Sequence, residues 1–281
     1  MKVFDVALKE LYPTKGGSLR CMVAQELYDP WQPEAETWRR PAVIVVPGGA
    51  YSIVSKREGL PVAAEFFAKG YQTFVLTYLC QPQGVAYPEQ LIELASAVDY
   101  VKKHADELRV NPEEVFVVGF SAGGHLTCNL AVEHESVSQK AGVELDCKPT
   151  AVGLCYPVIT EKAGYVGTHK NLLDGYTATA KKELLKTLNL NEAVTDSTSP
   201  AFIWTTAGDN VVPSENSLLF AYELAKRKIP YELHVYPQGY HGLSTGTREA
   251  NVPPYAGEYE RVTQWTENCI KFFRSFCKEP F

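Results

Sequence analysis

The stretch VFVVGFSAGGHL, residues 115–126, decides the fold. It begins with a continuous run of β-branched and aromatic residues, which is typical of a strand buried on both faces. The run then breaks into GFSAG, residues 119–123, and a helical pattern follows. This is the GxSxG pattern, in which a tight strand-to-helix turn lifts a serine hydroxyl to the end of a sheet. We therefore predict that Ser121 is presented to a ligand; the alternative is a glycine-rich turn with an incidental serine.

Apolar runs on either side of this stretch extend the pattern to a whole sheet. The expected strands are residues 18–25, 42–47, 71–79, 115–120, 150–157, 201–208 and 231–237. Helical periodicity lies between them, over residues 59–70, 87–108 and 214–230. In the helix at 87–108, the apolar residues share one stripe and the charged residues lie opposite. Strands that alternate with helices predict an α/β fold with a mostly parallel central sheet and helices on both faces.

The regular spacing of strands and helices fails once. About forty residues separate the strand at 150–157 from the strand at 201–208, whereas most connections need only a handful of residues beyond their helix. We therefore predict one domain over residues 1–281 with a lid-like insertion at 160–199 that holds one or two short helices.

Composition and charge narrow the class of partner. The chain of 281 residues is 45% hydrophobic and 21% charged, so a substantial core is available. The formal net charge is −6, and the lysines and arginines are scattered. We therefore expect neither nucleic acid nor a membrane surface as a partner, and a small neutral molecule suits this surface better.

The cysteines and the chain start indicate a compartment. Seven cysteines occur, none in a CxxC pair, which argues against a zinc ribbon or a dithiol redox site. We expect them to be buried small hydrophobic residues in a reducing compartment. The first residues lack the apolar core of a signal peptide, and no window approaches the roughly 18 apolar residues of a membrane span. A cytoplasmic protein is the expectation.

A nucleophilic serine needs a general base, and after a strand–turn–helix serine the expected chain order is serine, acid, histidine. His241 lies in a loop just after the last strong strand, where chain ends return to the carboxyl edge of a parallel sheet. We therefore assign it as the base. The other histidines precede the serine, follow it within its helix, or lie in the insertion or on a strand: His104, His125, His134, His169 and His234.

The acid that orients the histidine should also follow a strand end. Asp209 does, because the strand at 201–208 ends there and a turn follows. Asp196, in the insertion, and Glu215, at the start of the next helix, are the rivals. Asp209 is the preferred orienting acid.

Acyl transfer also needs hydrogen-bond donors for the oxyanion of the tetrahedral intermediate. One should be the backbone N–H of Ala122, directly after the serine. The second should come from a loop after an earlier strand, where Gly48 and Gly49 let the backbone approach a substrate closely. We expect the N–H of Gly49 or of Ala50 to complete this oxyanion hole.

Four segments in this order and at this spacing, VVPGGAYS, GFSAGGHL, AGDNVVP and GYHGLS, resemble the α/β-hydrolase superfamily. More narrowly, they are similar to its small bacterial esterases that act on acetylated sugars and xylan fragments. The resemblance covers about residues 40–245 and implies a serine esterase with Ser121, His241 and Asp209 as its triad. One departure is PGGA at residues 47–50, where lipases and esterases often have HGGG. A proline cannot make that histidine's hydrogen bonds, so the loop lacks its usual anchor.

The resemblance implies hydrolysis of short acyl esters, acetyl above all, from sugars or oligosaccharides through an acyl-enzyme, with no metal and no organic cofactor. A peptidase of the prolyl-oligopeptidase kind shares the catalytic order, but it usually brings a large additional domain. A non-catalytic binding module on a hydrolase scaffold is the alternative from another class. Aromatic residues near the pocket would either stack on sugar rings or pack the loops; they are Tyr165, Tyr176, Tyr255 and Tyr259.

Overall fold

An eight-stranded sheet forms the centre of the computed structural model, which describes residues 1–25, 38–164, 167–251 and 259–278. The strand order is β1-β2-β4-β3-β5-β6-β7-β8. The pairs β1–β2 and β2–β4 are antiparallel, and the other pairs are parallel, as the alternation of strands and helices predicts. The strands are β1 (Lys2–Ala7), β2 (Ser18–Val23), β3 (Arg40–Val46), β4 (Gln72–Thr77), β5 (Val110–Phe120), β6 (Val152–Cys155), β7 (Ala201–Thr206) and β8 (Tyr231–Tyr236).

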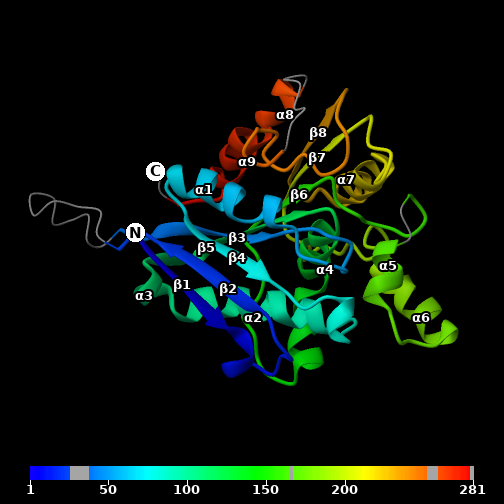
Figure 1. Ribbon diagram of the computed structural model, residues 1–281, viewed down its shortest axis with the longest axis horizontal. Helices are drawn as coiled ribbons and strands as arrows, with labels where there is room; N and C mark the ends of the chain where they lie inside the picture. The colour runs from blue at the N-terminus through cyan, green and yellow to red at the C-terminus, as the bar shows by residue number, and fades with distance from the viewer. Residues whose placement is uncertain (26–37, 165–166, 252–258, 279–281) are drawn as a thin grey trace, which may run out of the picture.

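Helices cover both faces of this sheet (Figure 1). In the view of Figure 1, α1, α8 and α9 lie above the sheet, and α2 and α3 lie below it. The helices are α1 (Leu60–Ala68), α2 (Glu89–Lys103), α3 (Ala105–Leu108), α4 (Ala122–Ala141), α5 (Gly167–Leu172), α6 (Ala178–Leu188), α7 (Glu215–Arg227), α8 (Glu260–Thr263) and α9 (Trp265–Arg274). Short 3-10 turns add η1 (Leu8–Glu10), η3 (Lys56–Glu58) and η4 (Gln81–Gln83).

The alternation of side chains along each strand divides the core between the two faces. In β3, Val43 and Val45 pack into the cluster that includes residues of α1 and α9. Ile44 and Val46 of the same strand pack into the cluster that includes residues of α2 and α4. The strand is therefore apolar throughout because both of its faces are covered.

The apolar-run criterion does not predict β1. This strand lies at the sheet edge, pairs only with β2 among the described strands, and exposes several of its residues. Val3, for example, is 52% exposed. An edge strand with one partner needs no continuous apolar run, so its sequence carries little of the expected signal.

The charged side of α2 is covered by the protein. Glu89, Glu93 and Asp99 lie opposite the apolar stripe, as predicted, yet all three are buried. Segments from elsewhere in the chain hydrogen-bond to them: Tyr12 Oη donates to Asp99 at 2.8 Å, and the backbone N–H of Leu79 donates to Glu93 at 2.8 Å. Periodicity identifies the apolar face of a helix, but it cannot show that another segment packs on the polar face.

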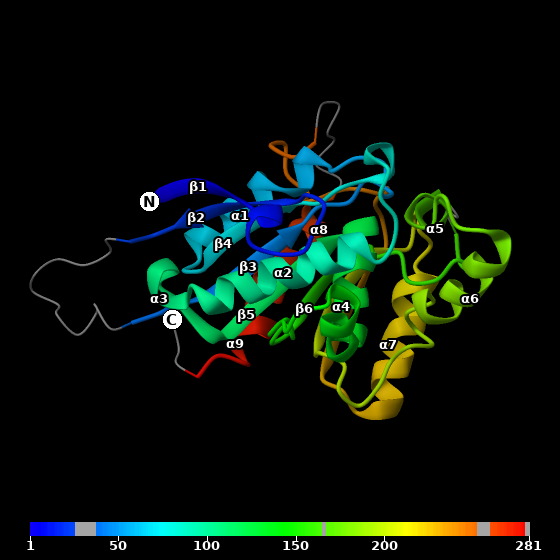
Figure 2. The ribbon, with the colours of Figure 1, turned by 90° about the horizontal axis from the view of Figure 1, so that it is seen from below.

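The predicted insertion holds two helices, α5 and α6, which lie together beyond one end of the sheet in both views (Figures 1 and 2). Its role as a lid stays a prediction. All seven cysteines are free; Cys277 is half-buried and the others are buried. Within the described ranges, no helix is both long enough and apolar enough to span a bilayer.

Candidate active site

Ser121 stands at the sharp turn between β5 and α4. Its backbone has φ 53° and ψ −116°, which is a strained conformation for a residue with a side chain. Backbone hydrogen bonds hold the turn. The N–H of Ser121 donates to the backbone carbonyl of Cys155 at 3.0 Å, and the carbonyl of Ser121 accepts the backbone N–H of His125 at 3.0 Å. The strained serine therefore stands at the carboxyl end of a central strand, between that strand and its helix.

The two glycines of the GFSAG segment are required by close packing. A Cβ atom at Gly119 would lie 2.2 Å from Oγ1 of Thr127. A Cβ atom at Gly123 would lie 2.2 Å from the carbonyl oxygen of Val46. Real Cβ atoms do not approach other atoms so closely, so the strand and the helix meet at this angle only because both positions lack a side chain.

Ser121, His241 and Asp209 form a hydrogen-bonded triad, although they come from three separate loops. Oγ of Ser121 lies 2.8 Å from Nε2 of His241, and Nδ1 of His241 lies 2.7 Å from Oδ2 of Asp209. The carboxylate accepts from Nδ1–H, which leaves Nε2 free to accept the serine proton. The loops follow β5, β7 and β8, whose parallel carboxyl ends meet at one edge of the sheet.

The acid of the triad is fixed from both sides. Its Oδ1 accepts the backbone N–H groups of Val211 and Val212, each at 2.9 Å. The side chain of Asp209 is 1% exposed and that of His241 is 17% exposed. Two backbone N–H groups and the imidazole donate to this buried carboxylate and fix its orientation. The low dielectric around the carboxylate strengthens its interaction with the imidazole.

The competing histidines have other partners. His125 contacts Oη of Tyr51 at 3.0 Å and the carbonyl of Leu188 at 3.2 Å, and His169 contacts the same carbonyl at 3.4 Å. Burial lowers the pKa of His125 to about 3 and that of His169 to about 4. The remaining histidines bond to nearby groups on their own elements: His104, His134 and His234.

The competing acids lie on other elements and have other surroundings. Asp196 pairs with Arg227 at 3.0 Å on the surface. Glu215 is in the first turn of α7, where it lines a shallow surface pocket. Neither hydrogen-bonds to His241 in the described part of the chain.

The loop proposed for the oxyanion hole has an unusual backbone. Gly49 has φ 128°, and Ala50 and Tyr51 have φ 54° and 55°. A Cβ atom at Gly49 would lie 2.1 Å from the carbonyl of Ile53, so only glycine fits there. Within the described residues, the backbone N–H groups of Gly49 and Ala50 have no protein acceptor.

The N–H of Ala122 likewise has no protein acceptor in the described residues. It belongs to the first residue of α4, where backbone N–H groups have no partner within the helix and the helix dipole favours negative charge. These three N–H groups therefore have no protein acceptor among the described residues, and two of them follow Gly48, which packs against Ser121. The choice between Gly49 and Ala50 as the second oxyanion donor stays a prediction.

A buried carboxylate anchors the loop where the usual histidine is replaced by Pro47. Oε2 of Glu58 accepts the N–H of Gly48 at 2.9 Å, and Oη of Tyr78 donates to the carbonyl of Pro47 at 2.8 Å. No sequence signal identifies Glu58, because it stands in a charged segment that is typical of a surface turn. Tyr156 was also not singled out from the sequence. Its position directly after the end of β6, at the same sheet edge as the triad, is the signal that could have identified it.

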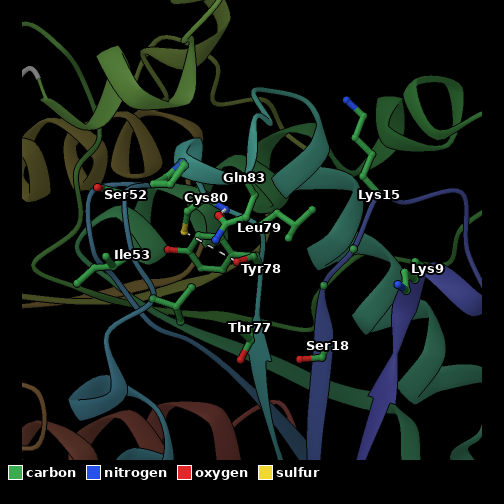
Figure 3. Close-up of a pocket in the computed structure, with 14 residues that line it drawn as sticks. Lys9, Lys15, Ser18, Ser52, Ile53, Thr77, Tyr78, Leu79, Cys80 and Gln83 are labelled. Atoms are coloured by element: carbon green, nitrogen blue, oxygen red, sulfur yellow. Dashed lines mark hydrogen bonds between the residues drawn. The ribbon is translucent and has the colours of Figure 1, made fainter.

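A cavity of about 720 Å³ borders this loop (Figure 3). Ser52 and Ile53 line one side of it, and Lys9 and Lys15 stand on the opposite side. None of the triad residues lines it. The cavity therefore does not hold the reacting side chains.

The proposed sugar-stacking aromatics are only partly described. Tyr176 donates from Oη to the carbonyl of Tyr87 at 2.8 Å, and Tyr259 packs edge-on against Tyr240. Both have ordinary packing roles in these contacts. Tyr165 and Tyr255 lie outside the described residues.

The sequence matches one protein family over most of its length. The BD-FAE family matches residues 27–224. Among curated proteins, the chain is 35% identical over 226 residues to Endo-1,4-beta-xylanase B of Butyrivibrio fibrisolvens, a match that covers 79% of this chain and 35% of the relative. It is 29% identical over 213 residues to an acetylxylan esterase of Xylanibacter ruminicola. This match covers 73% of this chain and 42% of the relative. The chain spans about two fifths or less of the length of these relatives.

Solved structures support the α/β-hydrolase prediction. An acetyl ester-xyloside bifunctional hydrolase from Caldicellulosiruptor lactoaceticus has 32% identity and a TM-score of 0.76, with 92% of this chain and 88% of that chain covered. MGS-M1, an alpha/beta hydrolase from a deep-sea metagenome library, has 28% identity and a TM-score of 0.76, with 98% of both chains covered. The predicted fold class is confirmed.

Proposed function

The chain belongs to the BD-FAE family, and from that membership we propose that it is a carboxylic ester hydrolase of the serine type. Ser121 is the nucleophile, His241 the general base and Asp209 the orienting acid. The observation that carries the proposal is the continuous hydrogen-bonded path from Oγ of Ser121 through His241 to Asp209, with separations of 2.8 and 2.7 Å.

In the proposed acylation step, Oγ of Ser121 attacks the ester carbonyl while Nε2 of His241 takes the hydroxyl proton. The carbonyl oxygen becomes an oxyanion, which accepts hydrogen bonds from the N–H of Ala122 and from that of Gly49 or Ala50. The imidazolium, held by Asp209, then gives the proton to the leaving alcohol, and the acyl group stays on the serine.

In the proposed deacylation step, water takes the place of the alcohol. His241 removes a proton from the water as it attacks the acyl-enzyme, and the same N–H groups stabilise the second oxyanion. Collapse returns the proton to Oγ of Ser121 and releases the carboxylic acid. Neither a metal nor an organic cofactor enters these steps.

We propose short acyl groups, acetyl above all, on sugars or oligosaccharides as the substrate. The support comes from relatives: one similar protein is an acetylxylan esterase, another is a xylanase, and a similar solved structure is an acetyl ester-xyloside hydrolase. The net charge of −6 also suits a neutral substrate better than a polyanion.

The test compares hydrolysis of 4-nitrophenyl acetate, butyrate and octanoate by the wild type and by Ser121→Ala. We expect rapid turnover of acetate by the wild type and a loss of several orders of magnitude in the variant. Acetylated and deacetylated xylo-oligosaccharides, followed by release of acetic acid, then test the substrate class. Turnover that survives in Ser121→Ala would mean a different nucleophile, and cleavage of a dipeptidyl anilide without ester hydrolysis would favour a peptidase.

A further inference from the structure

Glu58 is a buried carboxylate next to the triad that the proposed reaction does not use. It ends η3, between the loop of Gly48 and helix α1, and it is 3% exposed. No lysine, arginine or histidine of the described residues forms an ion pair with it. A buried charge without a counterion persists only where strong hydrogen bonds replace its hydration, so the contacts of Glu58 indicate what it does.

One oxygen of the carboxylate holds the loop of the oxyanion hole. Oε2 accepts the N–H of Gly48 at 2.9 Å. A Cβ atom at Gly48 would lie 3.0 Å from that oxygen and 2.9 Å from Cβ of Ser121. Gly48 is therefore inserted directly between the carboxylate and the nucleophile, and the carboxylate sets how far the loop stands from the serine.

The other oxygen of the carboxylate connects to the loop of the base. Oε1 accepts the hydroxyl of Tyr156 at 2.8 Å, and the oxygen of that hydroxyl accepts the N–H of Ser244 at 2.9 Å. Ser244 is three residues after His241, and the ring of Tyr156 packs edge-on against the His241 imidazole at 5.1 Å between centroids. The path therefore reaches the base through both the backbone and the ring.

The direction of each hydrogen bond requires a carboxylate at position 58. A backbone N–H group can only donate, and Tyr156 donates its hydroxyl hydrogen to Glu58 while its oxygen accepts the N–H of Ser244. Burial, and then the charge of Glu58, raises the pKa of Tyr156 well above its ordinary value, so the phenol keeps its proton. Glu58 thus faces one donor at each of its two terminal atoms, which a carboxylate satisfies and an amide does not, because one terminal atom of the amide is itself a donor.

A direct contact between η3 and the loop of His241 supports this path. A Cβ atom at Gly242, directly after His241, would lie 3.1 Å from Nη2 of Arg57 and 4.0 Å from Oε1 of Glu58. Oγ of Ser244 also donates to the carbonyl of Arg57 at 2.7 Å. The loop of the base therefore rests on the same 3-10 turn that carries the carboxylate.

We propose that Glu58 is a positioning residue that fixes the oxyanion loop and the base loop relative to each other, through Gly48 on one side and Tyr156–Ser244 on the other. The catalytic meaning of this inference rests on the proposed function, since the two loops supply the oxyanion donors and the base of that reaction. Glu58 does not touch the substrate in this proposal.

The test uses Glu58→Gln, which keeps the size of the side chain but presents an NH₂ group to one of the two donors. Glu114→Gln is the matched control, because Glu114 is also buried and also accepts a backbone N–H, that of Lys278, but lies in β5 well before the carboxyl end that carries Ser121. Three quantities are measured at pH 7 for each folded variant. They are the amide hydrogen exchange of residues 47–55 and 241–246, the rate at which a fluorophosphonate labels Ser121, and kcat and KM for 4-nitrophenyl acetate.

For Glu58→Gln we expect faster exchange in both segments, labelling and kcat reduced about tenfold or more, and KM within about threefold. Glu114→Gln should change none of these by more than about twofold. Wild-type exchange, labelling and kcat in folded Glu58→Gln would overturn the proposal, and so would an equal loss in Glu114→Gln, which would indicate general destabilisation.

If Glu58→Gln does not fold, the variant Tyr156→Phe tests the proposal. It removes the link from Glu58 to Ser244 and leaves the hydrogen bond between Glu58 and Gly48 in place. We expect faster exchange at residues 241–246 and a kcat several-fold lower, while unchanged values in both would overturn the proposal. Failure of the proposed function gives a different result, namely a wild type without ester hydrolysis. The exchange and labelling measurements still test the role of Glu58 in that case.

Discussion

Nδ2 of Asn171 donates a hydrogen bond of 2.8 Å to the carbonyl oxygen of Ala50. This bond joins α5 of the insertion to the strained loop that carries the proposed oxyanion donors. Ala50 has φ 54°, a conformation that a residue with a side chain keeps only where the surroundings hold it. The insertion therefore contributes to the geometry of this loop.

Asn171→Ala should lower kcat for 4-nitrophenyl acetate about fivefold, because one partly buried hydrogen bond that holds the Ala50 peptide is lost. KM should change less, since the acyl group of this substrate is small. Lys170→Ala, at the exposed neighbouring position of α5, is the control and should behave as the wild type. Equal kcat values for both variants would mean that the bond to Ala50 does not shape the site.

Asp209→Asn should fold normally but lower kcat by about 10³- to 10⁴-fold. The asparagine oxygen can still accept the two N–H groups of Val211 and Val212, so the loop keeps its anchors. Its NH₂ group then faces Nδ1 of His241 and favours the tautomer whose Nε2 carries a proton and cannot accept from Ser121. Steady-state kinetics measure the loss. Asp196→Asn, which removes the rival acid, should retain kcat, and the reverse pattern would exchange the two assignments.

Gly123→Ala should lower the free energy of unfolding by about 2–3 kcal/mol or more, or prevent folding, because the new methyl group would meet the Val46 and Pro47 carbonyls. Gly142→Ala is the comparison, since its φ is 71° but no atom lies within 4 Å of the new Cβ. It should cost only about 1 kcal/mol of left-handed backbone strain. Urea unfolding followed by circular dichroism gives both values. Similar losses for the two variants would show that close packing is not what requires Gly123.

The folded protein should lose stability as the pH falls below about 6.5, because buried histidines resist protonation, His125 and His169 most strongly. Burial lowers the pKa of His125 to about 3 and that of His169 to about 4, from an ordinary value of 6.5. The unfolded chain therefore binds more protons than the folded chain in this range, and the free energy of unfolding falls with decreasing pH until both groups are protonated in the folded state.

Urea unfolding at pH 7, 5.5 and 4.5 measures this loss, and His169→Gln should make the decline shallower. His104→Gln, at the half-exposed end of α2, is the control and should leave the decline unchanged. A decline that is equally steep in His169→Gln and the wild type would assign the acid sensitivity to other groups.

Residues at strand ends were predictable from the sequence, and residues that act through packing were not. Ser121, Asp209 and His241 each follow an apolar strand, so the parallel sheet alone brings them to one edge. Glu58 stands in a charged segment, and its burial depends on loops that are distant in sequence.

The same limit applies to the secondary structure. The spacing of apolar residues predicted α2, but not that the segment around Tyr12 packs over its charged face. The sequence did not predict the edge strand β1. A strand that pairs with one neighbour and has one covered face needs few apolar residues, so its hydrophobic pattern is weak. Hydrophobic periodicity and turn-forming residues are local properties of a sequence. The burial of a polar group depends on contacts between residues that are distant in the sequence, and no local pattern predicts these contacts.

The wide separation of the triad along the chain has a consequence for folding kinetics. Ser121 and His241 are 120 residues apart, and Asp209 lies 32 residues before the histidine. Contacts between such distant residues form only after large loops close, and their loop-closure entropy makes them late events. Helices form much earlier, so during refolding from urea the far-ultraviolet signal should recover before Ser121 becomes reactive towards a fluorophosphonate. Labelling of that serine would then count only completely assembled molecules.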